Sequence, residues 1–361
     1  MCIRDRGDVV SEDYLNFMQL DDEQIQQHKQ AIYHKEHHYL ALSGGGARGA
    51  FGAGLLAGWA EHGDRPSFTM VSGVSTGALI APYAFLGEKY DPVIREIYVA
   101  HSTDDLFRRR NVFSIVTGDS VMDVSGFVAL IKRYLPDNLI DEIAVQYRLG
   151  RELIVGTTNL DSERPVIWSI GAIAASDHPG RYDLVRRVIM ASASLPVAFP
   201  PVMIPVLADG AQYDEMHVDG GVANQVFVYP LGMDWSIITQ KLKVVGKPKL
   251  YVVRNAKLSP EWSTTERKTV SIGIRSLDSL MRTQGLGDLY RIYTGALRDG
   301  IDYNLAYIPD DFVDTSTETV DANTMLELYN IGQSLGRNGY NWLKAPPGAE
   351  AVEPASSTGP R

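Results

Sequence analysis

Two glycine-rich turns, each set between a short apolar run and a helical segment, restrict what this chain can fold into. The apolar run Tyr39–Ser43 leads into Gly44-Gly45-Gly46, and a second run at 68–72 leads into Gly73-Val-Ser75-Thr-Gly77. A helical pattern follows each turn, at about residues 48–62 and 76–86. Short apolar strands that alternate with helices are typical of layered α/β proteins. The sequence therefore predicts an α/β fold with a mostly parallel central sheet.

The same alternation continues along the chain, and no linker divides residues 38–344 into two domains. We expect further strands near 152–157, 165–170, 203–207, 212–218 and 249–254, and further helices near 92–100, 124–134, 140–147, 182–191, 288–297 and 325–335. Residues 7–37 are polar and rich in glutamine, so we expect a leader that runs over the surface. Residues 345–361 are rich in Pro, Gly and Ser, and we expect a disordered tail.

Composition excludes several classes of function. The net charge of −10 in 361 residues argues against electrostatic attraction to nucleic acid or to anionic lipid headgroups. No apolar stretch reaches the ~18 residues that a transmembrane helix needs. The one cysteine, Cys2, leaves no disulfide framework and no thiolate metal site.

The first six residues, Met-Cys-Ile-Arg-Asp-Arg, read as the translation of a sequencing adapter, so we expect them to be foreign to the protein. A signal peptide or lipidation cysteine at the authentic start would then be missing. The sequence leaves both the cytoplasm and the bacterial cell envelope open as the location, and it does not determine the oligomeric state.

The strongest local motif is Gly73-Val-Ser75-Thr-Gly77, which lies between a strand and a helix. A serine on such a sharp turn projects its hydroxyl at the N-terminus of the helix. Side chains at the flanking positions would clash with the turn, which explains the glycines Gly73 and Gly77. The helix dipole and free amides there favour developing negative charge. The alternative is that Ser75 is an ordinary helix N-cap.

The triple glycine Gly44-Gly45-Gly46 lets several backbone amides point at one place, as an oxyanion hole requires. Arg48 follows in the first helical turn, where a cation opposes the helix dipole, so we expect it to hold the glycine loop in shape. A surface salt bridge is the alternative role for Arg48.

The segment Gly44–Gly49 also matches the G-x-G-x-x-G pattern of dinucleotide-binding (Rossmann-type) enzymes. That pattern expects an acidic residue at the end of the second strand to bind the ribose. Here Ser72-Gly73 occupies this place, so the nucleotide hypothesis explains one motif, whereas a hydrolase explains both.

A third motif, Asp219-Gly220-Gly221, follows a strand-like run. The glycines allow another segment to approach the carboxylate, which suits a base for Ser75. By itself, Asp-Gly-Gly is more often only a turn.

In this order, the three motifs resemble those of the patatin-like phospholipase family, and the proline-rich block Ala191–Pro201 is similar to a family block. The resemblance covers residues 39–227 best and extends to about 342. It implies a three-layer α/β/α fold and a Ser–Asp dyad without a catalytic histidine. Ser75 would be the nucleophile, Asp219 the base, and the amides of Gly44, Gly45 and Gly46 the oxyanion hole, with Arg48, Gly73, Gly77, Gly220 and Gly221 as supporting residues.

A catalytic histidine or a histidine metal site is a weaker alternative to the Ser–Asp dyad. His217 precedes Asp219 by two residues and would share its strand face, but we interpret it as an ordinary strand histidine. The cluster His34-Lys-Glu-His37-His38 matches neither zinc-protease motif, so we expect no metal site and no cofactor.

The expected function is hydrolysis of phospholipid or other lipid esters, with the substrate at a membrane or micelle surface. A nucleotide-dependent enzyme and a catalytically silent binding protein of the same fold stay open as alternatives.

Overall fold

The computed structural model describes residues 4–6, 12–100, 108–109, 120–208, 210–229, 233–262, 264–314 and 321–349. The predicted tail therefore lies outside the described residues from position 350 onward. Its first part, residues 345–349, is described, and the Tyr290 hydroxyl donates a hydrogen bond to the carbonyl of Pro347 there.

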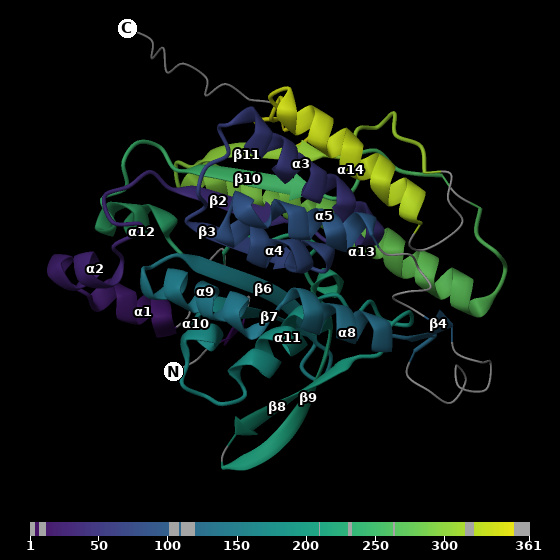
Figure 1. The fold of residues 1–361 in the computed structure, drawn as a ribbon, viewed down its shortest axis with the longest axis horizontal. Coiled ribbons are helices and arrows are strands. Elements are labelled where there is room, and N and C mark those ends of the chain that lie inside the picture. The colour runs from purple at the N-terminus through teal and green to yellow at the C-terminus, as the bar shows by residue number, and fades with distance from the viewer. Residues whose placement is uncertain are drawn as a thin grey trace, which may run out of the picture.

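Nine strands of the described residues form a mixed, mostly parallel sheet at the centre of the molecule (Figure 1). Its order is β1-β7-β6-β3-β2-β10-β11, and β9 pairs with both β6 and β8. The strands are β1 (Arg4–Arg6), β2 (His38–Leu42), β3 (Met70–Val74), β6 (Glu152–Asn159), β7 (Arg164–Ser169), β8 (Val202–Ala208), β9 (Ala211–Asp219), β10 (Lys249–Arg254) and β11 (Asp302–Tyr307). The five strands from β6 to β11 in this order run parallel, whereas β7, β1, β9 and β8 pair antiparallel. This confirms the predicted fold class.

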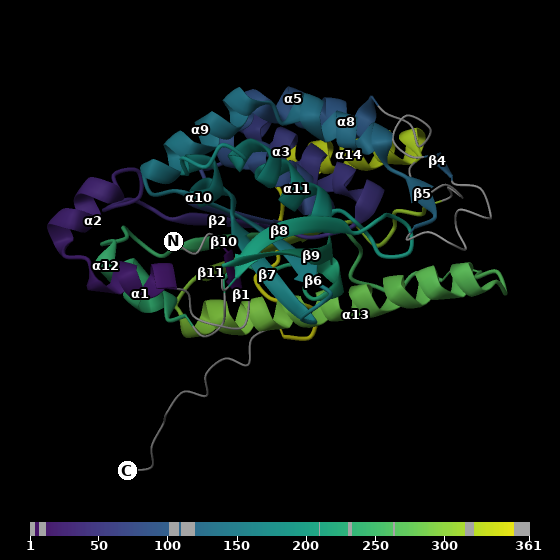
Figure 2. The ribbon, with the colours of Figure 1, turned by 90° about the horizontal axis from the view of Figure 1, so that it is seen from below.

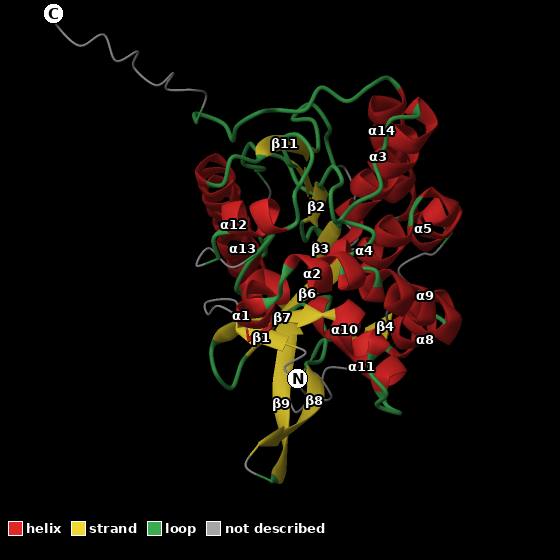
Figure 3. Cartoon of the chain, turned by 90° about the vertical axis from the view of Figure 1, so that its left-hand side faces the viewer, coloured by secondary structure: helices red, strands yellow, loops and turns green. Residues whose placement is uncertain are grey.

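Helices cover both faces of the sheet and make three layers (Figure 3). One face carries α3 (Gly49–His62), α4 (Thr76–Leu86), α5 (Asp91–Val99), α8 (Ser125–Tyr134), α9 (Asp137–Arg148), α10 (Ile170–Ala175), α11 (Arg181–Ser192) and α14 (Ala322–Arg337). The other face carries α1 (Glu12–Gln19), α2 (Asp22–His28), α12 (Trp235–Lys241) and α13 (Thr269–Arg298). Two short strands, β4 (Arg108–Arg109) and β5 (Met122–Asp123), pair apart from the main sheet. No described helix combines the length and the apolar character needed to cross a bilayer.

Alternate side chains of each central strand enter different cores. In β2, Leu40 and Leu42 join the core under α3 and α4, whereas Tyr39 and Ala41 join the core under α12 and α13. A strand buried on both faces is apolar throughout, which explains its uniformly hydrophobic sequence. Helix α3 is apolar all round for a similar reason, because α14, α5 and α4 pack against it and its buried side chains join the larger core.

The leader is anchored to the domain at a few points. Ile25 in α2 is fully buried in the core under α12, and the Lys241 ammonium donates to the carbonyls of Met18 and Leu20. Most side chains of residues 16–37 are exposed, and the buried side chains of Ile25, Ile32 and His37 anchor this surface segment to the domain.

Candidate active site

Ser75 lies on the sharp turn between β3 and α4, as the sequence predicts. Its φ of 54° and ψ of −125° are strained for a residue with a side chain. Ser75 is the N-cap residue of α4, but its side chain makes no capping hydrogen bond. The hydroxyl is therefore not used as a helix cap, and the serine is only 9% exposed.

Gly73 and Gly77 make this turn possible because the two ends of the turn touch. A Cβ atom at Gly73 would lie 2.5 Å from the carbonyl oxygen of Gly77, and one at Gly77 would meet the backbone of Leu42 and Ser43. Both positions therefore exclude any side chain, which is the physical basis of the motif.

The glycine loop lies directly beside Ser75. A Cβ atom at Gly44 would be 3.2 Å from the Cβ atom of Ser75. Gly45 and Gly46 have φ values of 159° and 58°, so the loop turns in conformations that glycine adopts readily. The Gly44 amide donates to the carbonyl of Gln225 at 3.0 Å, whereas in the described part of the chain nothing accepts from the Gly45 and Gly46 amides. Of the three amides in the loop, those of Gly45 and Gly46 are therefore the two that the described residues leave without an acceptor.

Two polar residues fix the shape of the glycine loop. The Ser43 hydroxyl donates to the Gly44 carbonyl at 2.7 Å and accepts the Asn255 amide hydrogen at 2.8 Å. The Asn255 side chain donates to the Ser43 carbonyl at 2.9 Å and accepts from the Gly52 amide at 3.1 Å. Asn255 was not identified from the sequence, because it follows β10 and no motif marks it.

Asp219 ends β9 and is almost fully buried, at 1% exposure. Its Oδ1 atom accepts a hydrogen bond from the Gly221 amide at 2.7 Å. Burial raises the pKa of Asp219 from 3.8 to about 7, and hydrogen bonds from the Ser75 side chain and the Gly221 amide oppose this rise. The structure thus brings together Ser75 and Asp219, which are 144 positions apart in the sequence.

The glycines after Asp219 permit this approach. A Cβ atom at Gly220 would collide with the Gly156 carbonyl of β6, and one at Gly221 would lie 3.0 Å from Asp219 Oδ1. The Asp219 amide donates to the Ser194 carbonyl at 2.9 Å, so the proline-rich block also contacts the site.

Ser192 is a buried residue that the sequence analysis did not identify. Its hydroxyl accepts the Ser75 amide hydrogen at 3.0 Å and donates to the Gly156 carbonyl at 2.6 Å. It therefore ties the strained Ser75 turn to β6, beside the strand that carries Asp219. Its position within Ala191–Pro201, the block of the resemblance, was the signal that could have revealed it.

Gln225 forms one wall of the site. Its Oε1 atom lies 2.6 Å from where a Gly44 Cβ atom would be, and its Nε2 atom is close to Gly221. The carboxylate of Asp288 in α13 accepts from the Gln225 amide at 2.7 Å and from the Val226 amide at 3.3 Å. Helix α13 thus holds the segment that connects the glycine loop with the Asp219 turn.

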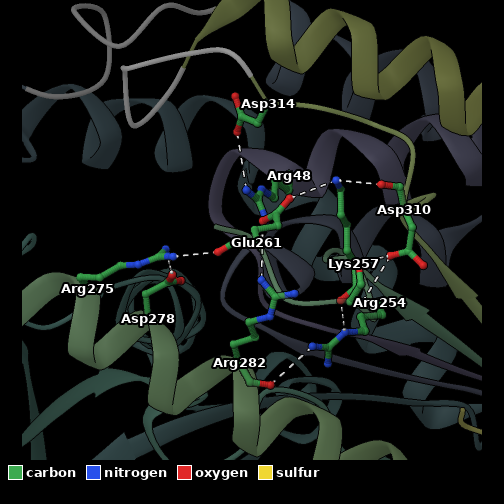
Figure 4. Close-up of polar contacts among 10 residues, drawn as sticks. Arg48, Arg254, Lys257, Glu261, Arg275, Asp278, Arg282, Asp310 and Asp314 are labelled. Atoms are coloured by element: carbon green, nitrogen blue, oxygen red, sulfur yellow. Dashed lines mark hydrogen bonds and ion pairs between the residues drawn. The ribbon is translucent and has the colours of Figure 1, made fainter. Parts of the chain in front are cut away.

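Arg48 contacts acidic side chains rather than the glycine loop (Figure 4). Its guanidinium lies 2.6 Å from Glu261 and 3.6 Å from Asp314. Burial raises the pKa of Glu261, but Arg48 and Lys257 outweigh it and hold that pKa below the ordinary value. Arg282 of α13 lies 3.7 Å from the same carboxylate. Arg48 therefore links the start of α3 to the loop after β10, and this ion-pair cluster surrounds Glu261.

His217 is fully buried, and its ring packs within the sheet. Its Nδ1 atom is 2.9 Å from the Thr157 hydroxyl, its Nε2 atom is 3.2 Å from Glu215, and its ring packs edge-on against Trp168. His217 is thus a core residue of the sheet, as interpreted from the sequence. The described residues include no group of three His, Cys, Asp or Glu side chains that could hold a metal ion.

The nucleotide hypothesis gains no support from the geometry. The G-x-G-x-x-G segment packs against Ser75, and the end of β3 is the serine turn itself rather than an acidic ribose ligand. A serine on a strained strand–helix turn, inside an α/β/α sandwich and beside a buried aspartate, is the arrangement typical of the class of α/β proteins that carry a G-x-S-x-G turn.

Comparison with known proteins identifies the family within this class. The family model described as "Patatin-like phospholipase" matches residues 40–231. The chain belongs to the patatin-like phospholipase family, and membership implies a lipid acyl hydrolase. Among solved structures, the chain is similar to VipD from Legionella pneumophila, at 12% identity and a TM-score of 0.33, over 84% of this chain and 67% of that one. A search of curated protein sequences gave no match.

Proposed function

We propose that the protein is a serine acyl hydrolase that cleaves lipid esters through Ser75 and Asp219. The observation that carries the proposal is the buried Asp219 carboxylate, whose pKa of about 7 is shaped by burial and by the hydrogen bond from Ser75. An ordinary aspartate is a poor base for a serine hydroxyl because its pKa is low. Burial raises the pKa of Asp219, which makes the carboxylate a stronger base.

In the first half of the reaction, Ser75 Oγ forms a bond to the ester carbonyl carbon while its proton passes to Asp219. The carbonyl oxygen becomes an oxyanion, which accepts hydrogen bonds from the Gly45 and Gly46 amides and lies near the N-terminus of α4. The bond from carbon to the leaving alcohol oxygen then breaks, and Asp219 returns the proton to that alcohol. The product of this half is an acyl-enzyme.

Water releases the acyl group by the same route. Asp219 takes a proton from water as the water oxygen attacks the acyl carbon, and Ser75 Oγ leaves with that proton. The Gly44 amide has a different role, since its bond to Gln225 supports the loop while Gly45 and Gly46 supply the donors.

Substrate chemistry follows from the family, which favours phospholipids or related lipid esters. No cofactor or metal enters the proposed reaction.

Covalent labelling tests the proposal. A fluorophosphonate should label Ser75, as mass spectrometry of the labelled peptide would reveal, and Asp219→Asn should slow the labelling by about a hundred-fold or more. Hydrolysis of a water-soluble p-nitrophenyl ester should be lost in Ser75→Ala. A Ser75→Ala protein that retains near-native hydrolysis would discard the dyad.

A further inference from the structure

The side chain of Gln225 lies between the two parts of the proposed catalytic site. Its Oε1 atom is 2.6 Å from where a Gly44 Cβ atom would be, and that same position is 3.2 Å from the Cβ atom of Ser75. Its Nε2 atom is 2.4 Å from where a Gly221 Cβ atom would be, and that position is 3.0 Å from Asp219 Oδ1. The carboxamide therefore reaches from the glycine loop beside the serine to the turn that carries the aspartate.

The backbone of Gln225 is fixed by hydrogen bonds, whereas its carboxamide is not used for this purpose. The Gln225 carbonyl accepts from the Gly44 amide at 3.0 Å, and its amide donates to the Asp288 carboxylate at 2.7 Å. In the described part of the chain, nothing forms a hydrogen bond with the carboxamide. The residue is half-buried, and neither polar atom of its side chain is enclosed. Two donor hydrogens and an acceptor oxygen are thus presented beside the dyad.

Helix α13 holds the segment that carries Gln225. This helix lies on the opposite side of the sheet from α3 and α5 (Figure 2). Besides the bond to Asp288, the Gln284 side chain donates to the carbonyl of Ala223, two positions before Gln225. Gln284 and Asp288 are four positions apart, so they lie on one side of the helix. The position of the carboxamide is therefore set by contacts in which it takes no part.

The location of the carboxamide places it on the alcohol side of a bound ester. In the proposed reaction, the oxyanion lies at the amides of Gly45 and Gly46, whereas Asp219 lies beside the alcohol oxygen that it protonates. Gln225 Nε2 is close to Gly221, whose amide donates to Asp219 Oδ1 at 2.7 Å. The carboxamide therefore adjoins the alcohol rather than the acyl chain.

A neutral carboxamide suits a neutral polar group that can both donate and accept a hydrogen bond. A hydroxyl group has this combination. The cations of the neighbouring ion-pair cluster, Arg48 and Arg282, are already paired with Glu261 (Figure 4). The groups beside the dyad thus favour an alcohol that carries a further hydroxyl, as a glycerol ester does, over an alcohol that is apolar.

We propose that Gln225 is a specificity-determining residue that binds a hydroxyl group on the alcohol portion of the ester. This inference rests on the proposed function, because it requires an ester bound at Ser75. The hydrogen bond holds the leaving alcohol beside Asp219, and Gln225 takes part in no bond that forms or breaks.

Three soluble butyrate esters test this role. The alcohols are glycerol, propan-1-ol and p-nitrophenol, and the first two differ only in the two free hydroxyl groups of 1-butyrylglycerol. Wild type should hydrolyse the glycerol ester with a kcat/KM about ten-fold above that of the propyl ester. Gln225→Met retains the size of the side chain and removes its hydrogen-bonding groups. It should lower kcat/KM for the glycerol ester about ten-fold and change the other two by less than about three-fold.

Asn224→Ala is the matched control at the neighbouring position. The Asn224 side chain accepts a hydrogen bond from the Arg291 guanidinium at 3.0 Å, at an exposed place on α13, so its removal should preserve the preference for the glycerol ester.

The outcomes separate this role from the proposed function. The role of Gln225 is refuted if wild type hydrolyses the glycerol and propyl esters equally well, or if Gln225→Met retains the preference. It is also refuted if Gln225→Met slows all three esters equally, as a merely structural residue would. A protein that hydrolyses none of the esters and is not labelled by a fluorophosphonate would refute the proposed function, and the role of Gln225 with it.

Discussion

The hydroxyl of Ser192 accepts a hydrogen bond from the Ser75 amide at 3.0 Å, and it donates a hydrogen bond to the Gly156 carbonyl of β6. These two hydrogen bonds join the strained turn after β3 to the neighbouring parallel strand β6, and Ser192 is fully buried there. The position of the Ser75 hydroxyl therefore depends on a side chain that is not part of the proposed dyad.

Ser192→Ala is expected to lower kcat for a soluble ester by about ten- to a hundred-fold, because Ser75 would move relative to Asp219. Stability should fall by about 1–3 kcal/mol, since the substitution leaves the buried Ser75 amide and the Gly156 carbonyl without this partner. Ser194→Ala is the control, because within the described part of the chain the Ser194 hydroxyl bonds only to the Met190 carbonyl one turn earlier. Equal kcat in the two variants would contradict the positioning role of Ser192.

The pH dependence of hydrolysis should follow Asp219. A base must be deprotonated to accept the Ser75 proton, and burial raises the pKa of Asp219 to about 7. We therefore expect kcat/KM to decline about ten-fold per pH unit below an apparent pKa near 7 and to level off above it. An acidic limb near pH 4 would show that the titrating group is not this carboxylate.

Asp219 should also weaken the fold at neutral pH. Its folded-state pKa is above its ordinary value of 3.8, so the folded protein binds a proton more tightly than the unfolded chain between pH 4 and 7. The contribution of Asp219 to the free energy of unfolding is thus largest below pH 4, and it is lost as the pH rises through about 7. The difference between the two pKa values corresponds to at most about 4 kcal/mol.

Asp219→Asn removes this titration. Its gain in unfolding free energy over wild type should be small at pH 4, grow with pH and level off above about pH 7, as urea unfolding would measure. Asp234→Asn is the control, and its effect on stability should have the opposite sign. The hydrogen bond from Ser236 lowers the pKa of the exposed Asp234, whereas burial raises the pKa of Asp219. A gain for Asp219→Asn that is independent of pH would rule out the linkage.

The sequence was most informative where a motif records a steric requirement. Gly73, Gly77 and Gly220 each face a backbone carbonyl too close for a Cβ atom, so their identity reflects the tertiary structure directly. The strands before these turns are continuous apolar runs and were predictable for the same reason.

The sequence was less informative where a contact joins unmarked residues. Ser192, Asn255 and Gln225 act through hydrogen bonds or close contacts to segments far away in the chain, and no local pattern predicts those contacts. The first half of α13 was missed because its apolar residues face no core, and glycine and serine interrupt them. Strand β11 was missed because polar Asp302 and Asn304 alternate with its apolar residues. The roles of Asp219 and of the Gly45 and Gly46 amides stay predictions.

Gly73→Ala tests whether the serine turn is as tightly packed as its contacts indicate. The added Cβ atom would lie 2.5 Å from the Gly77 carbonyl and 2.8 Å from the Ala78 Cα atom, and both belong to backbone that cannot rotate away. Helix α4 must shift, so we expect hydrolysis of a soluble ester to fall by about a hundred-fold and stability by about 1–3 kcal/mol. Gly287→Ala is the matched control, since a Cβ atom there meets nothing within 4 Å on the exposed side of α13. That substitution should preserve hydrolysis and raise stability by about 1 kcal/mol, because alanine favours a helix interior over glycine. Gly73→Ala with full activity would mean that the turn has room to relax and that the glycine is not required there.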